Sequence, residues 1–270
     1  MLLAADANAR AISDEKGSGE GYLYRYRDLS AADRAEWVRQ IIVDSKLYFS
    51  APTMFNDPFD CQARFRVGDR QAFKARFRDQ AKQLASESGL PRKQRRQMTK
   101  GGVNPRELLK GITADTQRGI ESEVRVLSLS ATHDNILMWS HYTNGHQGVC
   151  LQFRLEADRG FFAGAQEVKY SHELPVADLL GEPMERVDKL MLTKAEEWRY
   201  EREWRVIRTD GISNLSFPPE LLTGVILGTR ISDANKKTVS EWVAQRGSAI
   251  AIYQAVLRPR EFGLEFQQIN

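Results

Sequence analysis

A short charged and aromatic segment, Trp198-Arg-Tyr-Glu-Arg-Glu-Trp-Arg205, places two carboxylates two residues apart between two tryptophans. It runs into Val206-Ile207, and this β-branched pair favours a strand over a helix. Side chains two apart on a strand share a face, so Glu201 and Glu203 would point one way and Trp204 the other. Such a strand would present both acids to a cleft. A ladder of ion pairs, with Glu203 bound to a neighbouring arginine, is the alternative interpretation.

The rest of the chain alternates short strand patterns with helical ones. Strands are expected at 22–27, 46–49, 124–130, 148–153, 168–170, 225–227 and 249–257, and helices at 31–44, 138–142, 184–198 and 233–245. The first helix would bury Trp37 with its aliphatic residues and be capped by Ser30. No G-x-G-x-x-G turn opens a helix and no Walker loop occurs. Short strands with irregular connections predict an α+β fold with a mixed, largely antiparallel sheet.

Length and composition predict one domain. The 270 residues, 41% of them hydrophobic, suit a single α+β domain at 22–270 after a flexible leader at 1–21. The leader carries Asp6 and too short an apolar stretch for a signal peptide, and no run of about 18 apolar residues predicts a membrane span. Cys61 and Cys150 lie in apolar contexts without a CxxC motif. They predict reduced core residues of a cytoplasmic protein.

Charge is concentrated in one part of the chain. Residues 64–118 hold 15 Lys and Arg against 5 Asp and Glu, a net +10, within a whole-chain charge of only +3. We expect a basic helical insertion here, with a helix opened by Asn104 and Pro105. Such a block attracts polyanions, so nucleic acid is a candidate partner. An ordinary charged helical surface is the alternative interpretation.

The histidines do not predict a metal centre. His133, His141 and His146 share one segment, but no zinc-ligand spacing accompanies them. Asp57 and Asp134 leave a metal-dependent hydrolase open, although we assign no metal ligand. The pair His141-Tyr142 better fits a pocket wall, because tyrosine offers a stacking face and histidine a hydrogen bond near neutral pH.

Four motifs in order resemble a bacterial family of unknown function, numbered 2971. The resemblance covers about residues 22–232 and says nothing about activity. The basic block has no counterpart in it. The motifs are Leu47-Tyr-Phe-Ser-Ala-Pro-Thr-Met-Phe-Asn-Asp-Pro-Phe-Asp60, Asn135-Ile-Leu-Met-Trp-Ser-His-Tyr142 with Gly148-Val-Cys-Leu-Gln-Phe153, Lys194 to Arg205, and Val225-Ile-Leu-Gly-Thr-Arg-Ile-Ser232.

A second resemblance suggests chemistry. An aromatic and basic strand with Arg25 and Arg27, then Ser128-Leu-Ser130, then Glu201-Arg-Glu203 is similar in order to the Arg–Ser–Glu class of mono-ADP-ribosyltransferases. That class usually has Ser-Thr-Ser in the middle motif, where this chain has Leu129. The resemblance implies a split sheet that binds NAD as substrate. Either arginine of the first strand would fill the class's arginine position.

The resemblance also implies a role for each residue. Glu203 would stabilise the oxocarbenium-like ribose, and Glu201 would orient or deprotonate the acceptor. Arg25 or Arg27 would hold the pyrophosphate. The serines Ser128 and Ser130 would brace the cleft, while Tyr142 would stack on nicotinamide beside His141.

Two other functions remain open from the sequence. Asp57, Asp60, His141 and Glu203 could surround a metal in a nucleic-acid-acting effector such as a nuclease. A non-catalytic binding module is the third possibility. A role as a bacterial toxin or defence effector with a protein acceptor rests on analogy alone.

Overall fold

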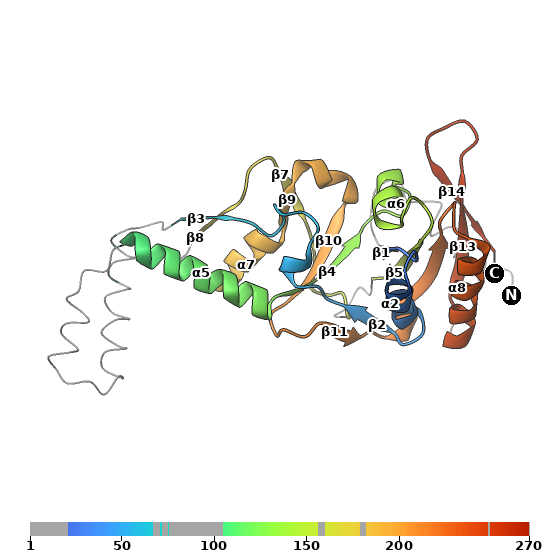
Figure 1. The fold of residues 1–270 in the computed structure, drawn as a ribbon, viewed down its shortest axis with the longest axis horizontal. Coiled ribbons are helices and arrows are strands. Elements are labelled where there is room, and N and C mark those ends of the chain that lie inside the picture. The colour runs from blue at the N-terminus through green and yellow to red at the C-terminus, as the bar shows by residue number, and fades with distance from the viewer. Residues whose placement is uncertain are drawn as a thin grey trace.

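The computed structural model describes residues 21–66, 71, 75, 105–155, 160–178, 182–247 and 249–269. Eight strands form one large sheet (Figure 1). In spatial order they are β14 (Leu264–Gln268), β13 (Ala251–Leu257), β12 (Leu222–Leu227), β5 (Val149–Arg154), β1 (Tyr22–Arg27), β4 (Arg125–Ser130), β10 (Glu203–Arg208) and β6 (Ala165–Glu167). Of its pairings only β12 with β13 is parallel. The prediction of an α+β fold with a largely antiparallel sheet is confirmed.

The large sheet separates in its middle. Strand β1 pairs with β5 along all six of its residues, and β4 pairs with β10 along all six of its own. Between β1 and β4, however, only Tyr24 and Ser130 are register partners. The two halves of the sheet therefore meet at one point, and side chains occupy the space where the strands diverge.

Helices cover both faces of the sheet. Helices α2 (Ala32–Ile42) and α8 (Asp233–Arg246) pack on one face, where Val38 and Val239 join a core that includes Leu23. On the other face, α6 (Ile136–Tyr142) packs Trp139 against β1, and Tyr24 and Tyr26 belong to that core. The alternation of Leu23 with Tyr24 on β1 follows from the two-residue period of a strand.

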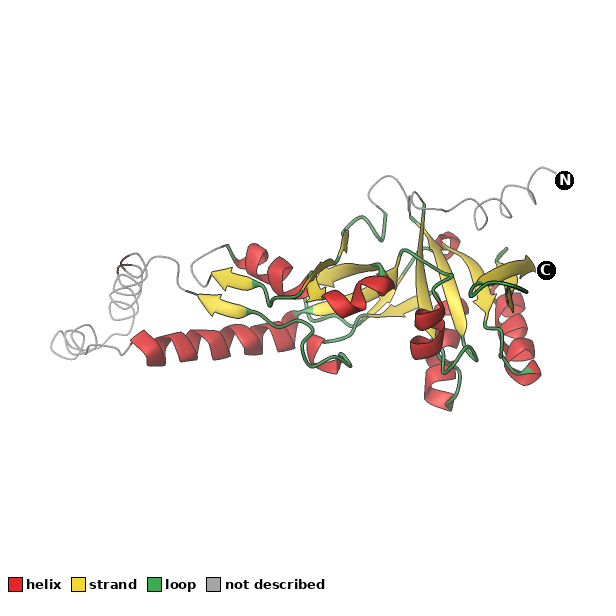
Figure 2. Ribbon diagram, turned by 90° about the horizontal axis from the view of Figure 1, so that it is seen from above, coloured by secondary structure: helices red, strands yellow, loops and turns green. Residues whose placement is uncertain are grey.

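Two helices and two small strand pairs form a second region beside the sheet. It contains α5 (Pro105–Glu123), α7 (Pro183–Met191) and the small pairs β3–β8 and β7–β9 (Figure 2). Ile120, Ala177 and Leu190 share a third apolar core there.

The short elements are β2 (Lys46–Tyr48), β3 (Arg64–Arg66), β7 (Lys169–Ser171), β8 (Val176–Asp178), β9 (Thr193–Ala195), β11 (Asn214–Ser216), η1 (Pro52–Met54), η2 (Glu196–Glu201) and η3 (Pro219–Leu221).

Two details of α2 differ from the expectation. Trp37 is 50% exposed, because only the aliphatic residues of this helix face the core. The N-cap is Ala31, and Ser30 instead donates its backbone N–H and its hydroxyl to Asp28, at 2.7 and 2.8 Å. The prediction that Ser30 caps the helix was therefore wrong, since the N-cap is the next residue.

The helix expected at 184–198 is also wrong in part. Helix α7 ends at Met191, and the chain then forms β9 and the short 3-10 helix η2. Strand β9 pairs in parallel with β7, so a tertiary contact overrides the local helical pattern. Cys61 and Cys150 are buried free thiols, as expected.

Two expectations fall wholly or partly outside the described residues. The leader at 1–20 is not described, and of the basic block the structure describes β3, residues 71 and 75, and α5. Helix α5 begins at Pro105, as its sequence predicts. No helix of the described chain combines the length and the apolar character needed to cross a membrane.

Candidate functional site

A cavity of about 750 Å³ opens where β1 and β4 separate. Its walls come from β1 and the start of α2, from the loop after β2, from β4, from α6, and from the segment joining η2 to β10. The volume lies within the range of sites for cofactors and small molecules. The gap in the sheet is thus a ligand-sized site.

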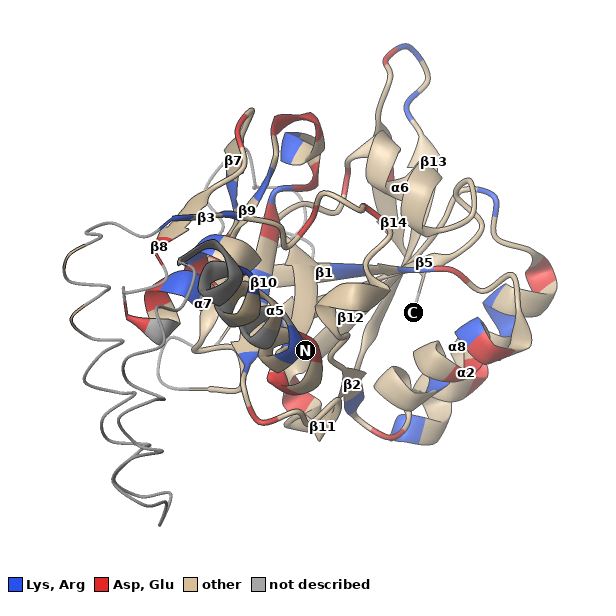
Figure 3. Cartoon of the chain, turned by 60° about the vertical axis from the view of Figure 1, so that its left-hand side comes forward, with Lys and Arg blue, Asp and Glu red and all other residues tan. Residues whose placement is uncertain are grey.

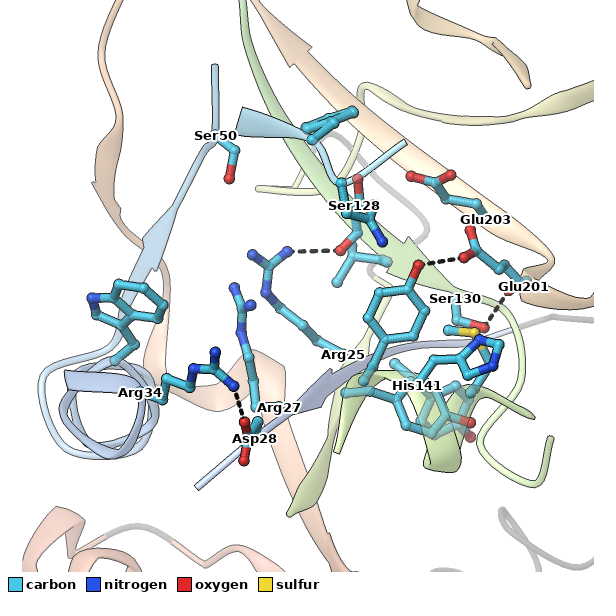
Figure 4. A pocket seen from close by; sticks show the side chains of 18 of the residues that line it. Arg25, Arg27, Asp28, Arg34, Ser50, Ser128, Ser130, His141, Glu201 and Glu203 are labelled. Atoms are coloured by element: carbon cyan, nitrogen blue, oxygen red, sulfur yellow. Dashed lines mark hydrogen bonds and ion pairs between the residues drawn. The ribbon is translucent and has the colours of Figure 1, made fainter. Parts of the chain in front are cut away.

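Two arginines of β1 point into this cavity. Arg25 and Arg27 alternate with the buried tyrosines of the same strand, which the two-residue period sends to the opposite face. Figure 3 shows this basic stretch of β1 in the middle of the sheet. Figure 4 shows both guanidinium groups directed into the gap. Arg25, only 7% exposed, donates from Nη1 to the carbonyl oxygen of Ser128 at 2.7 Å, where β1 would otherwise have paired with β4.

Neither arginine forms an ion pair within the described part of the chain, although the charge of Glu203 raises the pKa of Arg25 in part. The Nε of Arg25 and that of Arg27 are buried without a hydrogen-bond acceptor there. Burial lowers the pKa of Arg27 to about 10. Burial and then the charge of Arg27 lower the pKa of Arg25 well below its ordinary value. Two desolvated cations side by side favour a ligand with a multivalent anion such as a diphosphate.

A buried carboxylate cluster forms the opposite end of the cavity. Arg205 donates from Nε and Nη2 to Glu203 at 2.8 and 2.9 Å. It also binds both oxygens of Asp60, at 3.0 and 2.7 Å. Lys194 Nζ lies 3.0 Å from Glu203 and 2.5 Å from Glu201. Three carboxylates therefore surround two cations, which leaves one net negative charge.

The cluster separates the pKa values of its two glutamates. Burial opposes ionisation of Glu203, but the charges of Arg205 and Lys194, with a hydrogen bond from Ser128, outweigh it and lower its pKa to about 2. Burial raises the pKa of Glu201, Lys194 lowers it in part, and Glu203 raises it further. An acid whose pKa is lowered thus lies beside one whose pKa is raised.

Other polar side chains hold Glu201 in place. The Tyr142 hydroxyl donates to Glu201 Oε1 at 2.5 Å, and the Ser130 hydroxyl donates to the Glu201 carbonyl oxygen at 2.6 Å. His141 Nδ1 lies 3.0 Å from the Tyr200 hydroxyl. These contacts tie α6 and β4 to the segment that carries the carboxylates.

The structure brings all the predicted site residues to this one cavity. They are Arg25, Arg27, Ser128, Ser130, His141, Tyr142, Glu201 and Glu203. The expected strand geometry of the glutamates is wrong, since Glu201 ends η2 and Arg202 has a φ of 44° before β10 begins at Glu203. The glutamates converge through Lys194 instead of through a shared strand face.

Lys194 is the site residue that the sequence did not single out. It lies on β9, and no local pattern marks it as a partner of the glutamates. Arg205 was recognisable from its spacing to Glu203, and their ion pair does exist. That pair is buried and joins residues of the same strand, so it is not the exposed ladder of the alternative interpretation.

The geometry offers little to a metal ion. No group of three or more His, Cys, Asp or Glu suited to a metal occurs within the described chain. Asp60 and Glu203 are bound by Arg205, whose charge opposes a cation. The Asp57 side chain accepts the backbone N–H of Phe59 at 2.9 Å. The arrangement therefore does not favour the metal-dependent nuclease.

His133 lies in the core and not in the cavity wall. It is 6% exposed and packs between the rings of Tyr24 and Phe266. Burial lowers its pKa to about 4. It is a neutral core residue at physiological pH.

Comparison with known proteins adds one finding. Residues 138–206 match the model of a family described as "Protein of unknown function (DUF2971)". The match contains α6, β5 and the carboxylate segment. It is narrower than the expected 22–232 and leaves out the motifs at 47–60 and 225–232. No curated protein matches the chain, and no solved structure matches it.

Proposed function

We propose that this chain binds NAD in the gap between β1 and β4 and cleaves the bond between nicotinamide and ribose. ADP-ribose would pass to a macromolecular acceptor or to water. One observation carries the proposal: β1 and β4 separate beyond Tyr24. Two arginines whose Nε atoms lack acceptors in the described chain then line the same cavity, of about 750 Å³, as a carboxylate cluster of net negative charge.

The charges fit the two parts of this substrate. Arg25 and Arg27 line the cavity, where the oxygens of a diphosphate would accept the hydrogen bonds that the arginine Nε atoms do not make within the described chain. The guanidinium group is charged and forked, and both properties suit phosphate oxygens. The nicotinamide ribose would then lie toward Glu203. Its ring gains positive charge as the glycosidic bond breaks, and nicotinamide leaves with the bonding electron pair. An ionised carboxylate held by Arg205 is preorganised to stabilise that charge.

Glu201 would serve the second half of the reaction. The acceptor hydroxyl attacks the ribose carbon that lost nicotinamide, and its proton passes to Glu201. When water attacks instead, its proton passes to the surrounding solvent, so hydrolysis does not need Glu201. The raised pKa of Glu201 makes it a stronger base than an ordinary glutamate, which suits the role of a general base. Tyr142 orients this carboxylate through its hydrogen bond and lines the place where nicotinamide would stack.

The split sheet supports the same proposal at the level of fold, since the resemblance to mono-ADP-ribosyltransferases implies a sheet divided at the NAD site. The acceptor would be a protein or a nucleic acid drawn by the basic block at 64–118. Two buried free thiols fit a reducing compartment such as the cytoplasm. A role in toxicity or defence remains part of the proposal by analogy.

The test is direct. The whole chain is incubated with NAD, and free nicotinamide and ADP-ribose are separated and quantified over time. We expect nicotinamide release by the wild type and its loss in Arg25→Gln. The matched control is Arg154→Gln, an exposed arginine on the neighbouring strand β5, which should behave as wild type. Equal and negligible release by all three proteins would refute the proposal.

A further inference from the structure

The cavity has an apolar wall that the proposed chemistry does not use. Trp37 of α2 and Met54 of η1 both line the cavity, and they are 50% and 64% exposed. The Trp37 indole makes no ring contact with any aromatic residue in the described ranges. A large aromatic side chain left half exposed beside a cavity is a candidate binding surface.

This wall is continuous with the arginine pair. Arg27 ends β1, Asp28 follows it directly, and α2 begins at Ala32. The short turn therefore joins the arginine strand to the helix that carries Trp37, and both line the cavity. The turn is held by an ion pair between Asp28 and Arg34, which Figure 4 shows beside Arg27.

Met54 has a supported position as well. The Tyr48 hydroxyl lies 3.7 Å from Met54 Sδ, and the Tyr48 carbonyl oxygen is 3.4 Å from Nη2 of Arg25. The same short strand thus holds the thioether and contacts an arginine of the anion site. Polarisable sulfur is well suited to contact an aromatic ring.

We propose that Trp37 and Met54 bind the base of a purine nucleoside 5′-diphosphate whose phosphates contact Arg25 and Arg27. The proposal rests on the proposed function, of which it deepens the substrate class: the adenosine half of NAD would lie along α2 and the nicotinamide half toward Glu203. The lining supports this orientation, because Trp37, Met54, the two arginines and Glu203 all line the same cavity and Trp37 lies on the helix that follows the arginine strand.

Titration calorimetry on the whole chain tests it with ADP and, separately, inorganic pyrophosphate. Base–aromatic stacking is lost when the ring is truncated, so Trp37→Ala should weaken ADP binding about tenfold or more and leave pyrophosphate binding unchanged. Trp37→Phe keeps a stacking face and should restore most of the affinity. Phe262→Ala, an exposed aromatic on the β13–β14 turn, is the matched control and should bind ADP like the wild type.

Each outcome bears on the proposal. Loss of ADP binding in Trp37→Ala with rescue by Trp37→Phe supports it, and so does a weaker loss in Met54→Ala, whose exposed side chain makes misfolding a poor explanation. ADP affinity in Trp37→Ala within about twofold of wild type, or an equal loss for pyrophosphate, overturns it. Absence of ADP binding by the wild type also overturns it.

A separate nicotinamide assay distinguishes the two proposals. Trp37-dependent ADP binding without nicotinamide release would refute NAD cleavage and leave the base site standing. Nicotinamide release with a KM that is the same in Trp37→Ala would refute the base site and leave NAD cleavage standing.

Discussion

The ammonium group of Lys194 lies 2.5 Å from Glu201 Oε2, although the two side chains are only 6% and 4% exposed. The same group lies 3.0 Å from Glu203, so one buried cation binds both carboxylates of the Glu-x-Glu motif. The protonation of Glu201 and the position of Glu203 are therefore coupled. Substitutions in this cluster should separate a catalytic role from a structural one.

We expect Glu203→Gln to lower nicotinamide release at least about 100-fold, because the amide removes the negative charge that would stabilise the ribose cation. The variant should still fold. Lost charge-assisted hydrogen bonds with Arg205 should cost about 1–3 kcal/mol of unfolding free energy. Thermal melts and nicotinamide release are measured on the same preparation. The control Glu196→Gln alters a surface carboxylate that binds Arg199 and should change neither quantity much. A folded Glu203→Gln protein with wild-type release would leave Glu203 a purely structural residue.

Glu201→Gln should have a different effect. Its proposed role begins after the glycosidic bond breaks, so NAD hydrolysis should survive while transfer to an acceptor falls. Label from adenine-labelled NAD is followed into protein and into free ADP-ribose. Equal loss of both products would contradict the division of roles between the two glutamates.

Lys194→Met should shift the pH dependence of activity. Lys194 lowers the pKa of Glu201, so its loss should raise that pKa and move the acidic limb of the kcat/KM profile for transfer to the acceptor toward higher pH. The pKa of Lys194 itself is raised in the folded protein, because Glu203 and Glu201 outweigh its burial. Its stabilising ion pairs are therefore complete at neutral pH and are lost only above its ordinary pKa.

The conservative change Lys194→Arg is the control for this effect. It keeps the positive charge and should leave the acidic limb near its wild-type position. A Lys194→Met protein with a lower melting temperature but an unchanged pH profile would show that Lys194 only stabilises the fold.

Local patterns were sufficient to predict β1, β4 and the part of β10 that begins at Glu203, whereas Glu201, expected on the same strand, ends η2. The two-residue period of β1 buries Tyr24 and Tyr26 and leaves Arg25 and Arg27 for the other face. Hydrophobic periodicity alone determines such a face. It does not determine where two strands separate, because that depends on how the rest of the sheet twists and packs.

Lys194 and Trp37 show what the sequence did not reveal. Lys194 reaches the glutamates because β9 pairs with β7 and because Arg202 adopts a left-handed conformation at the end of η2. Both are tertiary features without a local signal. Trp37 fits the apolar pattern of α2 as well as its buried neighbours do, yet it is 50% exposed and lines the cavity.

The basic block yields a prediction that depends on charge alone. Its net +10 should make the chain bind RNA or DNA at low salt, with an affinity that falls steeply as ionic strength rises through counterion release. Replacing Arg92, Lys93, Arg95 and Arg96 with glutamine should reduce the salt slope. Gel-shift titrations at several salt concentrations measure both effects. If neither RNA nor DNA shifts the wild type at low salt, the block is only a solvated surface.

Arg27 should lower the unfolding free energy of the free protein and strengthen the binding of ADP. Its Nε is buried without an acceptor in the described chain, and burial lowers its pKa to about 10, so the free protein holds a poorly compensated charge. Arg27→Leu removes that charge and should raise the unfolding free energy by about 1–2 kcal/mol, measured by urea denaturation without ligand. The same variant should bind ADP about tenfold to 100-fold more weakly, because a charge-assisted contact to phosphate is lost. Arg154→Leu, at the exposed end of β5, should leave ADP binding unchanged and should raise the unfolding free energy less than Arg27→Leu does. An Arg27→Leu protein that is less stable than the wild type and still binds ADP normally would mean that Arg27 serves the fold and not a ligand.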